Sequence, residues 1–95
     1  MAAYVIVNDT ITDEDTFSEF RKRIAATIDA HGGRYLVRGG SVEVIEGGWS
    51  PGRLVVVEFD DGAAARAWLN SPEYVEVRKI RQRSADAEVI VVEGV

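Results

Sequence analysis

The sequence predicts an α+β fold in one domain, with strands and helices in the order β-α-β-β-α-β. The 95 residues match the length of a single domain and suffice for one modest core. The composition, 46% hydrophobic and 28% charged, is typical of globular proteins rather than disordered ones. Short apolar runs are separated by helical periodicity and by turn residues. We therefore expect one domain over residues 1–95.

The first third of the chain predicts a strand, a helix and a second strand. Residues 4–7 are apolar at every position, as in a buried strand. We expect Thr12 to cap the helix, because the acidic residues after it favour the positive end of the helix dipole. One apolar stripe then follows at helical spacing: Phe17, Phe20, Ile24 and Ile28. Gly32-Gly33 ends this helix, and residues 34–38 read as a strand.

The middle of the chain predicts a hairpin with a long connection. Residues 41–46 resume extended character, and residues 47–52 form a loop rich in turn residues. Residues 54–59 are the strongest strand signal in the sequence.

The last third predicts a divided helix and a final strand. Asp60 or Asp61 caps an alanine-rich helix, which residues 70–72 interrupt. Within that break a serine is a good N-cap and a proline a good first helical residue, so a second segment covers residues 73–84. Residues 89–92 form the last strand.

This element order predicts a ferredoxin-like split β-α-β sandwich with an antiparallel sheet. Right-handed crossovers place all helices on one face of that sheet. Residues 4–7, 54–57 and 89–92 do not alternate apolar with polar, so their strands are apolar on both faces. We therefore expect a second copy of the sheet to cover the helix-free face, which gives a homodimer.

Four stretches resemble a known bacterial family: residues 3–7, 31–40, 53–59 and 71–74, of which 31–40 is the most specific. The chain is similar to the domain-of-unknown-function 1330 family of the dimeric α+β barrel superfamily. The resemblance implies a ferredoxin-like fold and a homodimeric barrel, and it brings no activity, substrate or catalytic residues. Superfamily relatives include cofactor-free monooxygenases, muconolactone isomerases, chlorite dismutases and dye-decolourising peroxidases, so the fold alone does not indicate the chemistry.

Composition and motifs exclude several functional classes. A net charge of -5, from 11 basic and 16 acidic residues, argues against nucleic acid as a partner. The absence of cysteine removes disulfides, thiolate catalysis and cysteine-bound zinc. No phosphate-binding, dinucleotide-binding or metal-ligand motif is present, so we expect no cofactor and no metal. No apolar run is long enough to cross a membrane and no signal peptide is evident, so we expect no membrane partner and a cytoplasmic protein.

Two residues are candidates for catalysis. His31, the only histidine, continues the apolar helical stripe and is a candidate general acid or base; alternatively it is a structural histidine bonded to a carbonyl at the helix end. Glu58 would gain a raised pKa and abstract a proton if it pointed into a pocket. The alternative for Glu58 is an ion pair with an arginine: Arg38, Arg53 or Arg81.

Five further polar residues are candidates for substrate binding: Asn8, Tyr35, Arg38, Tyr74 and Arg81. The arginines would bind an anion and the tyrosines would donate hydrogen bonds. Alternatively the arginine stems pack while their guanidinium groups reach water, and the tyrosines find backbone partners. We expect Trp49, in a glycine-flanked loop, to contact the second copy; the alternative is that it caps the pocket.

Two functions follow from these candidates. The first is a cofactor-free small-molecule enzyme, similar to a monooxygenase or an isomerase, acting on a small anionic or aromatic metabolite between helices and sheet. The second is a non-catalytic homodimeric module that binds a small metabolite. An enzyme would gather the seven polar candidates around one cleft with displaced pKa values, whereas a module would pair them with each other and fill the cavity.

Overall fold

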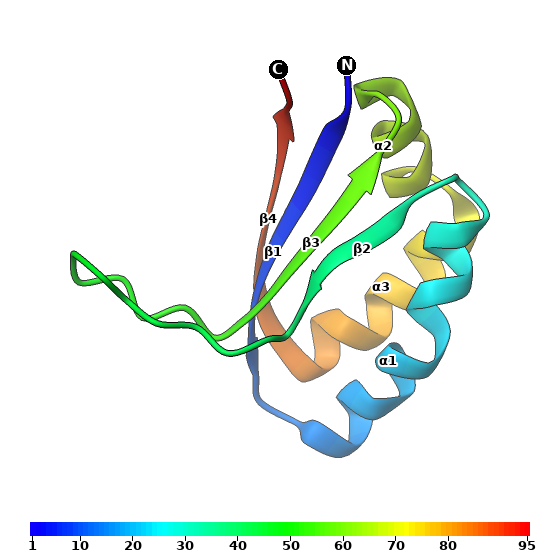
Figure 1. The fold of residues 1–95 in the computed structure, drawn as a ribbon. Coiled ribbons are helices and arrows are strands. Elements are labelled where there is room, and N and C mark those ends of the chain that lie inside the picture. The colour runs from blue at the N-terminus through cyan, green and yellow to red at the C-terminus, as the bar shows by residue number, and fades with distance from the viewer.

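A four-stranded antiparallel sheet with helices on one face forms the protein, as the computed structural model of residues 1–95 shows (Figure 1). The strand order is β2-β3-β1-β4. The elements in chain order are β1 (Ala3–Ile11), α1 (Glu14–Asp29), β2 (Arg34–Arg38), β3 (Arg53–Phe59), α2 (Gly62–Leu69), α3 (Pro72–Ser84) and β4 (Ala85–Glu93). This arrangement confirms the predicted ferredoxin-like fold.

Strand β1 lies at the centre of the sheet and continues further than the sequence predicts. Val5 pairs with Val57 of β3 on one side and with Val91 of β4 on the other. Successive side chains of a strand point to opposite faces, so every second residue meets the helices. The buried residues of β1 on that face are Ala3, Val5, Val7 and Asp9.

Helix α1 begins one residue later than predicted, with Asp13 rather than Thr12 as its N-cap. The Asp13 carboxylate accepts bonds from the Thr16 backbone N–H at 3.2 Å and from the Thr16 hydroxyl at 2.7 Å. The N–H of Thr12 instead donates to the Ser84 carbonyl at 2.8 Å, which ties it to the end of α3. The helix ends at Asp29, three residues before the first of the predicted glycines. Gly32 then takes a left-handed φ of 73° in the turn that follows.

Helices α2 and α3 begin as predicted. Asp61 caps α2, and Ser71 caps α3 with Pro72 as its first residue. The break between them brings Trp68 against Tyr74, with ring centroids 4.2 Å apart. These aromatic rings fill the layer between helices and sheet.

The connection between β2 and β3 differs from the prediction, because residues 41–46 form no strand. A register shift between Tyr35 and Val37 disturbs β2, which then ends at Arg38. We call residues 39–52 the hairpin arm; it projects away from the helices (Figure 1). Its largest apolar side chains are exposed: Val42, Val44, Ile45 and Trp49.

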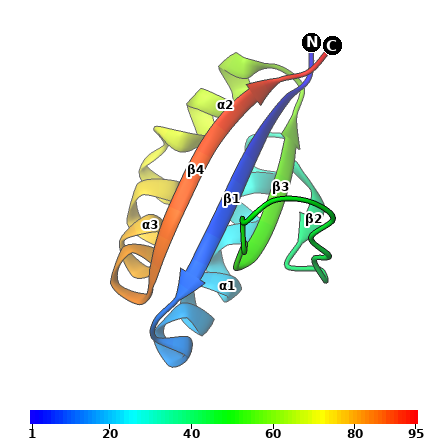
Figure 2. The ribbon, with the colours of Figure 1, turned by 90° about the vertical axis from the view of Figure 1, so that its left-hand side faces the viewer.

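The sheet face opposite the helices, which we call the helix-free face, has no other element packed against its strands (Figure 2). Ile90 and Val92 on this face are exposed by 55% and 42%. Ile6 and Val56, their neighbours on β1 and β3, are half-buried. The apolar character predicted for both sheet faces is therefore present. No helix in the structure has the length and apolar character needed to cross a membrane.

Candidate functional site

A cavity of about 30 Å³ lies between the sheet and the helices, with room for about two water molecules. Its wall is mostly apolar and includes Val7, Ile24 and Val55. Five side chains bring polar groups to it: Asp9, Tyr35, Arg53, Tyr74 and Arg81. A mostly apolar lining with a few converging polar groups is the usual composition of a small-molecule site, and the small volume restricts this cavity to very small groups.

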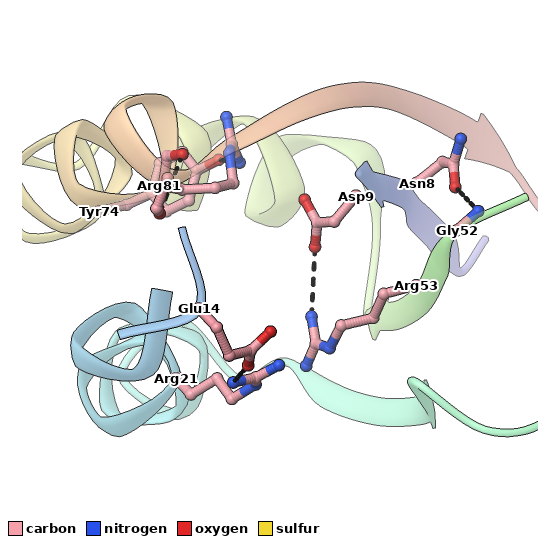
Figure 3. Close-up of polar contacts among 9 residues, drawn as sticks. Asn8, Asp9, Glu14, Arg21, Gly52, Arg53, Tyr74 and Arg81 are labelled. Atoms are coloured by element: carbon pink, nitrogen blue, oxygen red, sulfur yellow. Dashed lines mark hydrogen bonds and ion pairs between the residues drawn. The ribbon is translucent and has the colours of Figure 1, made fainter. Parts of the chain in front are cut away.

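Asp9 is the acidic group of the cavity. Its residue is only 2% exposed, because it takes the fourth helix-facing position of β1. One carboxylate oxygen, Oδ2, lies 3.2 Å from Nη1 of Arg53, while Oδ1 has no hydrogen-bond partner (Figure 3). Burial raises the pKa of Asp9 above its ordinary value of 3.8, and the opposing effects of Arg53, Arg81 and Arg21 do not cancel this rise.

Arg81 and Tyr74 approach the cavity from α3. They lie seven residues apart, which is two helical turns, so both side chains occupy the same side of the helix. Nη1 of Arg81 donates to the Tyr74 hydroxyl at 2.8 Å (Figure 3). Arg81 is 7% exposed, and its Nε–H group has no partner.

Arg53 and Tyr35 are the only cavity-lining residues that remain partly exposed, so they mark its mouth. Arg53 is placed by register, because it pairs directly with Asp9 across β1 and β3. Tyr35 lies beneath the Arg38 guanidinium, 4.5 Å from the ring centroid. Burial raises the pKa of Tyr35, although Arg38 and Arg53 act in the opposite direction.

Gly52 keeps Arg53 and Asp9 in this register. The Gly52 N–H donates to Oδ1 of Asn8 at 2.8 Å, which fixes the entry of β3 beside β1 (Figure 3). A Cβ atom at this position would lie 2.3 Å from the backbone oxygen of Asp9. Only glycine therefore permits the two strands to approach so closely here.

The cavity can hold an anion and move a proton. Two arginines and one aspartate give it an excess of positive charge when all three are ionised. Asp9 is its acid–base group, and its raised pKa brings the carboxyl closer to neutral pH. No cluster of three or more histidine, aspartate or glutamate side chains that could bind a metal ion occurs in the structure.

Three of the seven polar residues predicted from the sequence line this cavity, namely Tyr35, Tyr74 and Arg81. Asn8 does not, because it neighbours Asp9 on β1 and therefore points to the helix-free face. There its amide donates to Glu88 at 3.2 Å. In this position Asn8 links β1 to β4 through Glu88.

Glu58 also lies on the helix-free face, because Val57 and Phe59 occupy the core-facing positions of β3. It forms an ion pair at 2.6 Å with Arg34, which is none of the three arginines considered from the sequence. Arg38 is exposed above Tyr35.

His31 lies just beyond α1, with Nδ1 3.1 Å from the Thr27 carbonyl oxygen. Trp49 is 61% exposed and lines a separate groove of about 260 Å³ within the hairpin arm. None of Asn8, His31, Arg38, Glu58 and Trp49 lines the cavity, and the roles proposed for them stay predictions.

Sequence reasoning missed Asp9 as a candidate and considered Arg53 only as a partner for Glu58. The signal was present, since Asp9 has the same strand parity as Val5 and Val7. Extending the first strand by two residues would have placed its carboxylate against the helices. A strand that ends at Val7 leaves Asp9 in a loop, where aspartate is a common residue and does not indicate a site.

Comparisons with known proteins agree on the fold and leave the chemistry open. A family model described as "Domain of unknown function (DUF1330)" matches residues 2–95. A search of curated proteins finds no match.

Among solved structures, a protein of unknown function from Rhodopseudomonas palustris has a TM-score of 0.80 at 14% identity, covering 99% of this chain and 82% of that one. A dimeric ferredoxin-like protein of unknown function from Jannaschia has a TM-score of 0.69 at 16% identity, covering 99% and 100%. SnoaB, a cofactor-independent oxygenase from Streptomyces nogalater, has a TM-score of 0.68 at 14% identity, covering 98% and 92%. The family match over nearly the whole length, together with this shared architecture, shows that the chain belongs to the DUF1330 family.

Proposed function

We propose that this protein is a cofactor-free enzyme that transfers a proton on a small anionic molecule in the helix–sheet cavity. One observation carries the proposal: a buried carboxylate, Asp9, lines the cavity with one oxygen unpaired, and two arginines lie beside it. Perturbed titratable groups that converge on a pocket are characteristic of active sites.

In this mechanism Asp9 is the general base. Its Oδ1 takes a proton from the carbon next to a carbonyl group, and the electron pair of the broken C–H bond moves onto the carbonyl oxygen. Arg53 and Arg81 stabilise the negative charge that develops there. The protonated Asp9 then returns the proton to another position of the substrate, so the net reaction is an isomerisation. A carboxyl with a raised pKa suits both steps, because its strength as an acid and as a base is closer to balance near neutral pH.

Tyr74 is a positioning residue in this mechanism. Its hydroxyl accepts from Nη1 of Arg81 at 2.8 Å, which fixes the guanidinium of a residue that lines the cavity. The ring of Tyr74 is itself fixed against Trp68. Such packed support is what keeps a site in its productive geometry.

The similarity to SnoaB supports chemistry without a cofactor on this fold, although at 14% identity the likeness concerns the fold alone. Oxygenation would need molecular oxygen as a co-reactant, whereas proton transfer needs only the side chains that line the cavity. We therefore favour the isomerase-like reaction over the monooxygenase-like one. The alternative function, a metabolite-binding module, would use the same unpaired atoms of Asp9 and Arg81 to hold its ligand. The raised pKa of Asp9 in the cavity favours the enzyme.

We propose further that the protein is a homodimer formed through the helix-free face. Exposed Ile90 and Val92 make this face apolar, and the hairpin arm projects from the same side (Figures 1 and 2). The related structures from Jannaschia and from Bacteroides fragilis are both described as dimeric with a ferredoxin-like fold. In such a dimer Trp49 of the arm contacts the partner copy. We also propose that the protein is bacterial and cytoplasmic, as the sequence and the family resemblance lead us to expect.

Exchange of carbon-bound hydrogen with deuterium oxide tests the proposed reaction. A panel of small 2-oxo and 2-hydroxy acids is incubated with the protein in deuterium oxide, and exchange is followed by proton NMR. We expect exchange in at least one acid with the wild type and its loss in Asp9→Asn. Asp86→Asn, an exposed aspartate on β4, is the control and should keep the rate. Equal exchange by wild type and Asp9→Asn would contradict the role of Asp9, and binding without exchange would leave the module as the function.

A further inference from the structure

Two unpaired atoms of opposite hydrogen-bonding character belong to the residues around the same cavity. Oδ1 of Asp9 is an acceptor without a donor, and the Nε–H of Arg81 is a donor without an acceptor. Both residues are more than nine-tenths buried, at 2% and 7% exposure. Buried polar groups are nearly always hydrogen-bonded in native proteins, so a molecule that occupies this cavity should supply one acceptor and one donor.

The charges around the cavity indicate the chemical identity of the acceptor and the donor that a ligand should supply. The acceptor must reach Arg81, which lies on the same cavity as Arg53, so an anionic oxygen is preferred there. The donor must reach the carboxylate of Asp9, which attracts a hydroxyl and repels a second anion. Figure 3 shows the Asp9 carboxylate between the two arginines, with Oδ2 directed at Arg53.

The volume limits the size of the ligand. A cavity of about 30 Å³ accepts about two water-sized groups, so it has room for one carboxylate oxygen and a hydroxyl that stand on neighbouring carbons. The second carboxylate oxygen must then lie in the mouth, toward Arg53. The adjacent wall is apolar, with Val7, Ile24 and Val55, and it suits the carbon atoms between them. A longer molecule would have to extend through the mouth between Arg53 and Tyr35.

We propose that the cavity binds a small 2-hydroxycarboxylate, with the carboxylate on Arg81 and Arg53 and the hydroxyl donating to Oδ1 of Asp9. This inference rests on the proposed function, because it names the substrate class of the same site. The hydroxyl occupies one lone pair of Oδ1, and the second lone pair is left for the proton on the neighbouring carbon. A plain carboxylate would leave Oδ1 of Asp9 unpaired. A neutral hydroxyamide would leave the arginines without an anion.

Binding of three two-carbon probes tests the inference on the unmodified protein. Glycolate carries both groups, acetate lacks the hydroxyl, and glycolamide lacks the carboxylate. Dissociation constants are measured by NMR titration of the backbone amides. We expect acetate and glycolamide to bind at least about tenfold more weakly than glycolate, because each leaves a charged buried group without its partner.

Two variants, each with a matched control, locate the binding groups. Asp9→Asn should reduce the preference for glycolate over acetate, whereas Asp86→Asn should retain it. Arg81→Gln should weaken glycolate binding at least about tenfold, whereas Arg83→Gln, an exposed arginine on the same helix, should leave it unchanged.

Acetate or glycolamide binding as tightly as glycolate, or no binding of glycolate, would overturn the substrate class. The deuterium exchange experiment judges the proposed function separately. Loss of exchange in Asp9→Asn, combined with equal binding of glycolate and acetate, would support the proposed reaction and contradict the proposed substrate class. The opposite result is a wild type that prefers glycolate while Asp9→Asn exchanges normally. That result would support the proposed ligand class and contradict the proposed reaction.

Discussion

Burial destabilises the ionised carboxylate of Asp9 more than the neighbouring arginines stabilise it. Its side chain is 1% exposed, and an ionised carboxylate in such a place gives up nearly all of its hydration. Arg53 restores part of that loss through one contact at 3.2 Å, while Oδ1 receives nothing from the protein. The folded protein therefore holds the Asp9 proton more tightly than the unfolded chain does.

The pH dependence of stability follows from this difference. The stabilisation that protonated Asp9 contributes is complete below its ordinary pKa of 3.8 and is lost as the pH rises through the raised value. Asp9→Asn does not titrate, so the wild type should lose free energy of unfolding relative to this variant as the pH rises from 4. Urea unfolding at a fixed protein concentration over several pH values measures the difference. A wild type that gains stability relative to Asp9→Asn with rising pH would show that the Arg53 ion pair dominates.

Tyr74→Phe tests how Arg81 is held. The substitution removes the hydroxyl that accepts from Nη1 of Arg81, which is 7% exposed and has an unpaired Nε. We expect the free energy of unfolding to fall by about 1.5–3 kcal/mol, the range for a hydrogen bond to a charged group. Tyr35→Phe, which removes a hydroxyl at the cavity mouth, should cost less than about 0.5 kcal/mol. Equal losses in the two variants would mean that the Tyr74 hydroxyl does not support Arg81.

The residues of the site were predicted in part from the sequence. Tyr74 and Arg81 lie on one helical face by their spacing, and Tyr35 was a candidate because its hydroxyl can donate to a ligand. Asp9 was missed because its burial depends on how far β1 extends, and neighbouring strands determine that length. The ion pair of Glu58 with Arg34 depends on which strand face meets the helices, which residue parity alone does not fix.

Elements whose ends carry their own capping residues were the most predictable. The starts of α2 and α3 follow from Asp61 and Ser71, whose side chains accept from nearby backbone N–H groups. Pro72 adds to this through its fixed φ, which suits the first position of a helix. The start of α1 was one residue off, because two neighbouring residues, Thr12 and Asp13, are both suitable caps, and the carboxylate of Asp13 is the one that accepts from the helix. Residues 41–46 have strand-like composition and find no neighbouring strand to pair with in this chain.

Gly52→Ala tests the junction that places Arg53 beside Asp9. The added Cβ would lie 2.3 Å from the Asp9 backbone oxygen, and backbone atoms paired in a sheet cannot easily move away. We expect a loss of about 1–3 kcal/mol in the free energy of unfolding and weaker glycolate binding. Gly40→Ala is the control, because a Cβ there meets no atom within 4 Å. Equal stability of the two variants would show that the strand entry has room to shift.

In the whole molecule, the two faces of the sheet differ in what covers them. One face closes over the hydrophobic core and the cavity, and the other presents apolar side chains that no element of the same chain covers. An apolar surface of this kind is typical of an interaction site. The absence of polar alternation in the strands predicted this asymmetry from the sequence, whereas the course of the hairpin arm required the structure.

Ile90→Glu tests assembly through the helix-free face. We expect the wild type to have twice the mass of its 10.4 kDa chain by light scattering, with a melting temperature that rises with protein concentration. A charge at a position that is 55% exposed in one copy would be buried in the dimer, so Ile90→Glu should be monomeric. Ala26→Glu, at an exposed position of α1, should remain dimeric. A 10.4 kDa wild type at micromolar concentration would contradict the dimer.

We propose that Asp9 is a buried, incompletely paired base at the cavity. The most direct measurement is a pH titration of the Asp9 side-chain carboxyl carbon by carbon-13 NMR in the intact protein, with Asp9→Asn used to assign the signal. Desolvation predicts a titration midpoint above the ordinary 3.8, because Arg53 compensates only one oxygen. A midpoint at or below 3.8 would mean that the arginines fully stabilise the carboxylate, and Asp9 would then be a structural ion-pair partner rather than a catalytic base.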